Sequence, residues 1–187
     1  LDPGDRLVDD SLAVVNDWLV PRAPVDVAYT DEAEIRPNGR REAPRYKPDW
    51  SPERLRSQWY TGRLTVARRQ CVDAVGGFRT GLGGAHEHDL MLRLTERALR
   101  VVHVPEMLYL RATPYPPGDG VRVVQEHCDR VGIDARVEAL PEAGCYRVRR
   151  ALRGAPLVSI VIPTRGSASR IVGEHRVHAE HAVRSML

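Results

Sequence analysis

Three pairs of carboxylates are the residues of this chain best suited to chemistry. The pairs are Asp2 with Asp5, Asp31 with Glu32, and Glu87 with Asp89. Hard carboxylate oxygens suit a divalent cation such as Mn²⁺ or Mg²⁺, which neutralises an anionic leaving group. A carboxylate within hydrogen-bond reach of a hydroxyl also takes its proton as the hydroxyl attacks. The pairs therefore indicate group transfer to a hydroxyl, with a cation and a general base as the expected parts.

Each pair also has a structural interpretation. The first pair flanks the Pro3-Gly4 turn, and short acidic side chains commonly stabilise turns. The second pair follows a predicted strand and is compatible with a solvated loop. The third pair precedes a helix, whose N-terminus favours negative charge and acidic caps. A zinc protease motif is excluded, because Leu90 stands where the second histidine of HExxH is required.

The composition favours one folded domain with an appendage. The 187 residues include 42% hydrophobic and 28% charged positions, which is enough for one core. The net charge is +3, but acids and bases are interspersed, so no nucleic-acid surface is predicted. An arginine-rich nucleic-acid binder stays as an alternative, recognisable by an affinity that falls steeply with salt.

Cysteine usage and hydropathy indicate in which cellular compartment the protein is expected. Cys71, Cys128 and Cys145 are odd in number and lack CxxC spacing, which argues against a disulfide framework or a zinc site. No apolar run reaches the ~20 residues of a membrane-spanning helix, and no signal peptide opens the chain. We therefore expect a cytoplasmic protein, and peripheral association with the inner face of a membrane stays open.

The elements that must position the acids alternate between helices and strands. A helix capped by Asp9 or Asp10 should end at Pro21, and Val25–Thr30 alternates like a half-buried strand. This strand delivers the second acidic pair at its C-terminal end, where open α/β sheets bind ligands. The apolar positions expected on one face of the first helix are Leu12, Val15, Trp18 and Leu19.

The third acidic pair opens a helix predicted over Glu87–Leu99. Its apolar positions form one stripe, and its charged positions are expected to face outward. The stripe consists of Leu90, Met91, Leu94 and Ala98, and the charged positions are Arg93, Glu96, Arg97 and Arg100.

Caps, turns and periodicity predict the remaining elements. The helices are Pro52–Trp59 after the cap Ser51, Arg68–Val75 before the stop Gly76-Gly77, and Val121–Val131. The strands are Arg63–Ala67, Val101–Val104, Met107–Arg111, Ala135–Glu138, Tyr146–Val148 and a fully buried type of strand within Pro156–Gly166. Asn38-Gly39 marks a turn, and a Pro/Gly-rich stretch at 114–118 indicates a boundary.

Six motifs follow one another in the order seen in family 2 glycosyltransferases of the GT-A fold. The chain resembles in particular the tandem-domain enzymes of bacterial surface-polysaccharide assembly, over nearly its whole length. Each motif is weak alone, and their order makes the signal strong. The motifs are Leu1–Leu7, Tyr29–Glu32, Tyr46–Ser51, Val75–Phe78, Gly84–Arg93 and His103–Tyr109.

The resemblance implies an α/β fold, the C-terminal half of a GT-A domain with a mixed sheet flanked by helices. It divides the chain into the metal- and acceptor-side part of this domain, a linker with a helix and short strands, and the start of a second GT-A domain. These parts are residues 1–113, 114–155 and 156–187. The half that holds the donor nucleotide would precede Leu1.

The resemblance also assigns roles to residues. Glu87 takes the position of the catalytic base, and Asp89 that of a supporting acid. The expected donor-binding residues are Asp2, Asp5, Asp31, Glu32 and Arg111. The expected acceptor-binding residues are Trp50, Gly76, Gly77 and His103, with Trp59 and Tyr60 as weaker candidates because aromatic side chains are more often core. Asp2 and Asp5 would hold the cation, although Gly4 replaces the aspartate that usually binds it.

The implied activity is inverting transfer of a sugar from a nucleotide-sugar donor to a glycan or lipid-linked glycan acceptor. The alternative is a degenerate, non-catalytic glycosyltransferase-like binding module or a gene fragment. Gly4 and the donor-binding half expected upstream of Leu1 favour that alternative for the chain by itself. Leu110 replaces an aromatic residue before Arg111, so a surface arginine is the alternative interpretation of Arg111. No QxxRW motif occurs, which disfavours a processive synthase.

Overall fold

The computed structural model describes residues 2–155, 157, 159–161, 165, 167–171 and 174–184. The chain divides into two compact units, Leu1–Ala151 and Leu152–Leu187. The first unit contains all three acidic pairs. The second contains the β8–β9 hairpin (Ala168–Ile171 and Glu174–Val177) and α6 (His178–Arg184), none of which the sequence predicted.

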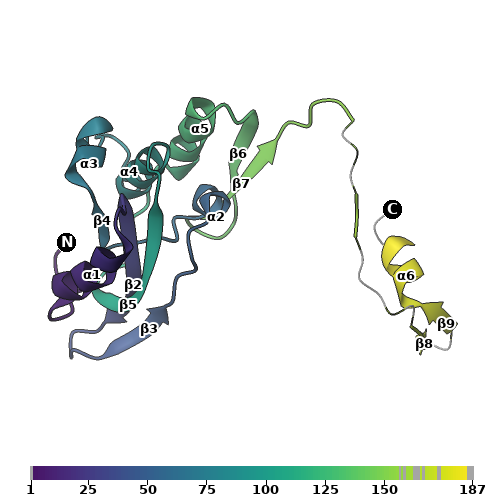
Figure 1. Ribbon diagram of the computed structural model, residues 1–187, viewed down its shortest axis with the longest axis horizontal. Helices are drawn as coiled ribbons and strands as arrows, with labels where there is room; N and C mark the ends of the chain where they lie inside the picture. Colours follow the sequence, from purple (N-terminus) through teal and green to yellow (C-terminus); the bar gives the residue numbers. More distant parts are fainter. Residues whose placement is uncertain are drawn as a thin grey trace. The chain divides into compact units, whose positions relative to one another are not determined.

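A mixed sheet forms the centre of the first unit (Figure 1). Its order is β1-β5-β2-β3, and β4 also pairs with β2. The long strands β2 and β5 are parallel, and every other pair is antiparallel. The strands are β1 (Arg6–Leu7), β2 (Val27–Ile35), β3 (Arg41–Arg45), β4 (Thr65–Ala67) and β5 (Val101–Arg111).

Helices flank this sheet, and a hairpin completes the unit. The helices are α1 (Ser11–Leu19), the 3-10 turn η1 (Val20–Arg22), α2 (Pro52–Ser57), α3 (Arg69–Ala74), α4 (His86–Thr95) and α5 (Gly120–Arg130). The hairpin joins β6 (Ala135–Ala139) to β7 (Tyr146–Arg150). The predicted α/β class, with a mixed sheet between helices, is confirmed and is compatible with a partial GT-A fold.

The core lies where α4 and α5 meet each other and the central strand. The stripe on α4 buries Met91 and Leu94, as the 3.6-residue period predicts. Val123 and Val124 of α5 are fully buried in the same cluster, together with Tyr29 of β2. Helix α5 therefore belongs to the core of the first unit, although it lies in the stretch 114–155 that the sequence analysis assigned to a linker.

Several local predictions hold because a single turn or cap dictates them. The Ser51 hydroxyl caps α2 by accepting a hydrogen bond from the backbone N–H of Arg54 at 3.3 Å. Gly76 and Gly77 adopt left-handed backbone angles and end α3. The Asn38-Gly39 turn joins β2 to β3, and β3 itself was not predicted.

Other local predictions were wrong in ways that tertiary contacts explain. The strand predicted to end at Thr30 runs to Ile35, because β5 and β3 continue the hydrogen-bond ladder on both sides. The two strands predicted around Pro105-Glu106 form one strand, β5, in which these two residues are exposed. Leu12 is exposed rather than packed, and Asp10 occupies the N-cap of α1 without a side-chain cap hydrogen bond.

The prediction of a second GT-A domain rests on the segment Pro156–Gly166. Six of its eleven residues lie outside the described residues, namely Pro156, Val158, 162–164 and Gly166. The division of the chain into glycosyltransferase domains therefore stays a prediction.

Candidate active site

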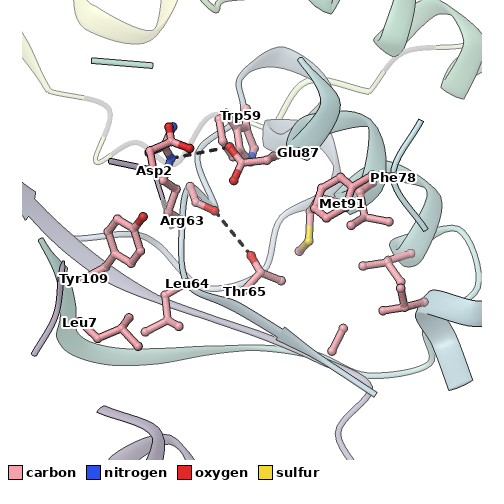
Figure 2. A pocket seen from close by; sticks show the side chains of 15 residues that line it. Asp2, Leu7, Trp59, Arg63, Leu64, Thr65, Phe78, Glu87, Met91 and Tyr109 are labelled. Atoms are coloured by element: carbon pink, nitrogen blue, oxygen red, sulfur yellow. Dashed lines mark hydrogen bonds and ion pairs between the residues drawn. The ribbon is translucent and has the colours of Figure 1, made fainter. Parts of the chain in front are cut away.

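The buried side chain of Arg63 forms ion pairs with carboxylates from distant parts of the chain. The Arg63 side chain is only 4% exposed. Its Nη1 lies 2.5 Å from Asp5 Oδ2, its Nη2 forms a close ion pair with Asp2, and its Nε faces Glu87 Oε2 at 3.6 Å. Figure 2 shows Asp2, Arg63 and Glu87 side by side at one wall of a cavity. The sequence predicted the acids of this site but not the guanidinium between them.

Asp5 is fully occupied by protein donors. Besides Arg63, the hydroxyl of Tyr109 donates to Oδ2 at 2.6 Å, and the backbone N–H of Ala112 donates to Oδ1 at 2.7 Å. Burial alone would raise the pKa of Asp5, but these hydrogen bonds outweigh it and hold the pKa below its ordinary value. The Asp5 carboxylate therefore joins the N-terminal turn to β5 through the Tyr109 hydroxyl.

The arrangement of Asp2 and Asp5 does not fit a divalent cation held between them. Both oxygens of Asp5 accept hydrogen bonds, and the Arg63 guanidinium supplies the positive charge that both carboxylates need. Gly4, which replaces the expected metal-binding aspartate, adopts a left-handed φ of 88°, and a Cβ there would lie 3.1 Å from Ala112 Cβ. A reaction step through a cation held between Asp2 and Asp5 is therefore not proposed.

Glu87 faces open space, and Asp2 lines the same cavity. It lines a cavity of about 460 Å³ whose walls are mostly apolar, including Leu64, Met91 and Phe78 (Figure 2). Burial raises the pKa of Glu87 above its ordinary value, and the nearby Arg63 opposes that rise. A partly desolvated carboxylate with a raised pKa, 29% exposed at a cavity wall, has the properties of a general base.

Helix capping does not account for the two acids at the start of α4. Its N-cap is Ala85, and no side chain forms a cap hydrogen bond there. The favourable interaction of negative charge with the helix N-terminus remains available to both acids.

Asp89 has a different environment from Glu87, although both lie in the first turn of α4. Its side chain is fully buried and pairs with Arg79 and Arg93. Burial alone would raise the pKa of Asp89, but the hydrogen bonds from both arginines lower it below its ordinary value. Arg93 in turn donates to the carbonyls of Val75 and Gly77, so it holds the end of α3 rather than facing outward as predicted.

Asp31 and Glu32 lie within β2 and are buried, so the interpretation of a solvated loop is wrong. Asp31 Oδ1 accepts a hydrogen bond from the backbone N–H of Lys47 at 2.8 Å and lies 2.7 Å from His103 Nε2. Glu32 Oε2 lies 3.2 Å from Lys47 Nζ, and its Oε1 accepts from the Tyr115 hydroxyl at 2.5 Å. The second acidic pair thus connects β2 to β5 through His103, and to the segments that contain Lys47 and Tyr115.

Arg111 also serves a buried network. It is 6% exposed and is therefore not a surface arginine. Its guanidinium donates to Glu34 at 2.7 Å and to the carbonyl of Thr113 at 2.6 Å. The ring of Tyr115 lies 4.9 Å from the Arg111 guanidinium carbon, which brings this arginine close to the Glu32 cluster.

The expected acceptor residues are not among the lining of the Glu87 cavity. Trp50 lines two other cavities, His103 is bonded to Asp31, and Gly76 and Gly77 end α3. Trp59, the weaker aromatic candidate, does line the cavity. Arg63 and Tyr109 complete the site, and no spacing in the sequence distinguished them from structural residues.

The chain is similar to bacterial proteins over most of its own length. It is 40% identical over 171 residues to the O-antigen biosynthesis protein RfbC of Myxococcus xanthus, a match that covers 85% of this chain and 13% of that protein. It is 34% identical over 180 residues to the uncharacterized protein y4gI of Sinorhizobium fredii, covering 88% of this chain and 20% of that protein.

The chain thus spans about an eighth of the first relative and a fifth of the second. No family model matches it. In the part of the chain that the structure describes, no helix is both long enough and apolar enough to cross a bilayer.

Proposed function

We propose that this chain is the acceptor-side part of a glycosyltransferase that acts in polysaccharide biosynthesis, with Glu87 as the general base. The observation that carries the proposal is the Glu87 carboxylate at the wall of a cavity, with its pKa raised by burial. Similarity to a protein named for O-antigen biosynthesis supports the substrate class, because such a protein takes part in making a glycan.

The proposed reaction is a direct displacement at the anomeric carbon of a nucleotide-sugar. Glu87 accepts the proton of an acceptor hydroxyl, the hydroxyl oxygen forms a bond to the anomeric carbon, and the bond from that carbon to the diphosphate breaks. One base that activates the acceptor for displacement inverts the configuration of the sugar. Arg63 holds Glu87 at the cavity wall, and the raised pKa brings this base closer to a working pH near neutrality.

The residues expected to bind the nucleotide-sugar donor differ in how accessible they are to a ligand. Asp2 is 46% exposed and faces the cavity, so it is the one best able to meet a ligand directly. Asp5, Asp31, Glu32 and Arg111 are buried and paired, and we assign them to positioning the site rather than to direct contact.

Replacing Glu87 with glutamine in the full-length protein tests this function. Loss of the base should lower kcat by at least about 100-fold, because general bases typically contribute 10²–10⁴-fold. The measurement is release of nucleoside diphosphate from a nucleotide-sugar in the presence of the glycan acceptor. Glu106→Gln is the matched control, since Glu106 is exposed in β5 and does not line the cavity. Unchanged transfer by Glu87→Gln would refute the assignment.

A non-catalytic carbohydrate-binding module is the second candidate. It is favoured by the Arg63 guanidinium, which already satisfies Asp2 and Asp5, the residues expected to bind the cation. This candidate predicts that the full-length protein binds a glycan but transfers no sugar with or without Mn²⁺. Transfer that depends on Glu87 would eliminate it.

A further inference from the structure

A second cavity, of about 330 Å³, shares Trp59 with the Glu87 cavity. We call it the aromatic cleft. Its aromatic walls are Trp59, Tyr115 and Tyr146, and its polar groups include Arg45 and Gln58. The sequence analysis did not single out this combination, and the proposed chemistry at Glu87 does not use it.

The aromatic rings of the cleft are held in fixed positions. Trp59 and Tyr115 pack against each other, with ring centroids 4.7 Å apart and planes tilted by 58°. The guanidinium of Arg111 lies over the Tyr115 ring at 4.9 Å, so Tyr115 fixes the cleft wall and Trp59 and Tyr146 carry the remaining ring surface. The Tyr115 hydroxyl is anchored on Glu32 at 2.5 Å. Tyr146 stacks on the buried ring of His88, with centroids 6.0 Å apart. Rigid, partly exposed aromatic faces bind the apolar face of a ligand at a low entropic cost.

Two planar polar side chains line the same cleft, and the guanidinium of one of them, Arg45, lies over the Tyr115 ring at 5.7 Å. The amide of Gln58 makes no hydrogen bond to any residue that the structure describes. Arg45 is 54% exposed, and its ion pair to Glu32 is long, at 3.7 Å. An amide and a guanidinium each offer several donors in one plane, which suits neighbouring hydroxyls. The ligand that matches has an apolar C–H face and a rim of hydroxyls, which describes a pyranose ring.

The floor of the cleft is tied to the start of α4. The backbone N–H of Gly84 donates to the carbonyl of Pro117 at 2.9 Å, and Gly83 forms a β-bridge with Gly118. A Cβ on Gly84 would lie 2.0 Å from the Pro116 carbonyl oxygen, so the two loops are in direct backbone contact. Three residues after Gly84 comes Glu87. A ring bound in the cleft is therefore held at a fixed position relative to the base.

We propose that the aromatic cleft binds a pyranose ring of the acceptor glycan, next to the sugar whose hydroxyl Glu87 deprotonates. Saccharide binding follows from the cleft alone. Its identification as part of the acceptor rests on the proposed function.

Saturation-transfer NMR on the 187-residue chain tests saccharide binding. The probes are the methyl α-pyranosides of glucose, mannose and rhamnose, with sorbitol as an open-chain control, each at about 10 mM so that a Kd of ~1 mM gives near saturation. At least one pyranoside should receive saturation on its ring C–H protons, and sorbitol should receive none. Absence of transfer to all three pyranosides, or equal transfer to sorbitol, would overturn the proposal.

A cleft-filling variant locates the binding. Ala143 lines the cleft and is exposed, so Ala143→Trp should abolish the NMR signal without disturbing the core. Glu142→Trp is the matched control, because Glu142 is the exposed neighbour that does not line the cleft. Equal melting temperatures of both variants would exclude misfolding, and equal NMR signals would overturn the assignment.

Kinetics of the full-length protein separate this proposal from the function of Glu87. Ala143→Trp should raise KM for the glycan acceptor at least 10-fold while kcat changes less than about 3-fold, because the cleft contributes ground-state binding. If Glu87→Gln abolishes transfer but Ala143→Trp leaves KM unchanged, the cleft assignment fails and the proposed function stands. If the chain binds pyranosides but Glu87→Gln retains activity, the role of Glu87 fails instead.

Discussion

At the scale of single residues, Glu87 and Asp89 are only two positions apart but have different environments. Glu87 faces a cavity and has a raised pKa, whereas Asp89 is enclosed by two arginines and has a lowered pKa. The difference arises because positions 87 and 89 lie on different sides of α4, where Glu87 faces Arg63 and Asp89 pairs with Arg79 and Arg93. A catalytic role suits Glu87, and a structural role suits Asp89.

Asp89→Asn should destabilise the chain by about 3 kcal/mol. The substitution removes the buried negative charge that Arg79 and Arg93 share, and it leaves the largely buried Arg93 without a counter-ion. Chemical denaturation monitored by circular dichroism measures the loss. Asp73→Asn is the control, since Asp73 is exposed in a surface pair and should change stability by less than about 0.5 kcal/mol. Similar losses for both variants would contradict the structural role of Asp89.

His88 should make stability fall as the pH drops below neutrality. Burial lowers the pKa of His88 to about 4, from an ordinary value of 6.5. Between these values the unfolded chain binds a proton that the folded chain excludes, so unfolding becomes easier as the pH falls from 6.5 toward 4. At 1.36 kcal/mol per pKa unit, this group contributes at most about 3 kcal/mol of that loss.

The contribution of His88 is isolated by His88→Gln, which keeps an N–H donor for the Leu55 carbonyl but does not titrate. Unfolding free energies measured from pH 7.5 to pH 4.5 should decline less steeply for this variant than for the unchanged chain. Identical slopes would show that other groups cause the pH dependence.

At the scale of elements, the site depends on contacts between loops more than on helix caps. Helix α4 starts without a side-chain cap, and its preceding loop is instead fixed by the backbone contacts of Gly83 and Gly84 with residues 116–118. These contacts set the position of Glu87, because the loop runs directly into the first turn of the helix.

Gly84→Ala should therefore force the two loops apart. Its Cβ would lie 2.0 Å from a backbone oxygen, which does not move as a flexible side chain would, and we expect a loss of about 2 kcal/mol or more. Gly39→Ala is the control: it has φ of 81° but no atom within 4 Å, so only backbone strain of about 1 kcal/mol is expected. Thermal unfolding compares the two, and a smaller loss for Gly84→Ala would contradict the close approach.

At the scale of the whole molecule, the first unit contains its own core and its own site. The β6–β7 hairpin is part of that core, because the Gln125 amide on α5 bonds to the backbone of Ala135 and Val137 at 2.9 Å each. Val137 is buried against the same cluster as Val123. The β6–β7 hairpin therefore belongs to the first unit and completes its core.

A chain that ends at Ala151 should keep the melting temperature of the full 187 residues within about 2 °C, because Leu1–Ala151 forms a compact unit by itself and single domains of this size usually unfold cooperatively. A chain that ends at Arg130 should melt at a much lower temperature, because it lacks the β6–β7 hairpin and exposes apolar side chains of the core. Burial of each such side chain stabilises the fold by about 1.5–3 kcal/mol. Calorimetry of the two truncations gives the comparison. A large loss on removing Leu152–Leu187 alone would refute the independence of the first unit.

The sequence by itself determined the elements whose signals are local. The Ser51 cap, the Gly76-Gly77 stop and the apolar stripe of α4 each depend on residues within one or two turns of the chain, so they were predicted correctly. The same local signals placed an acidic pair at the start of α4, and the resemblance of the surrounding motifs to family 2 glycosyltransferases implied that Glu87 is the base.

Only the tertiary structure decided what surrounds each acid. Asp5, Arg63 and Tyr109 are far apart in the sequence, and their meeting depends on the pairing of β1 with β5 and on the loop that carries Arg63. Burial then distinguishes a carboxylate that is already fully bonded from one that faces open space. Sequence spacing does not report burial or long-range pairing, and for that reason it named the acids of the site but not the arginine that holds them.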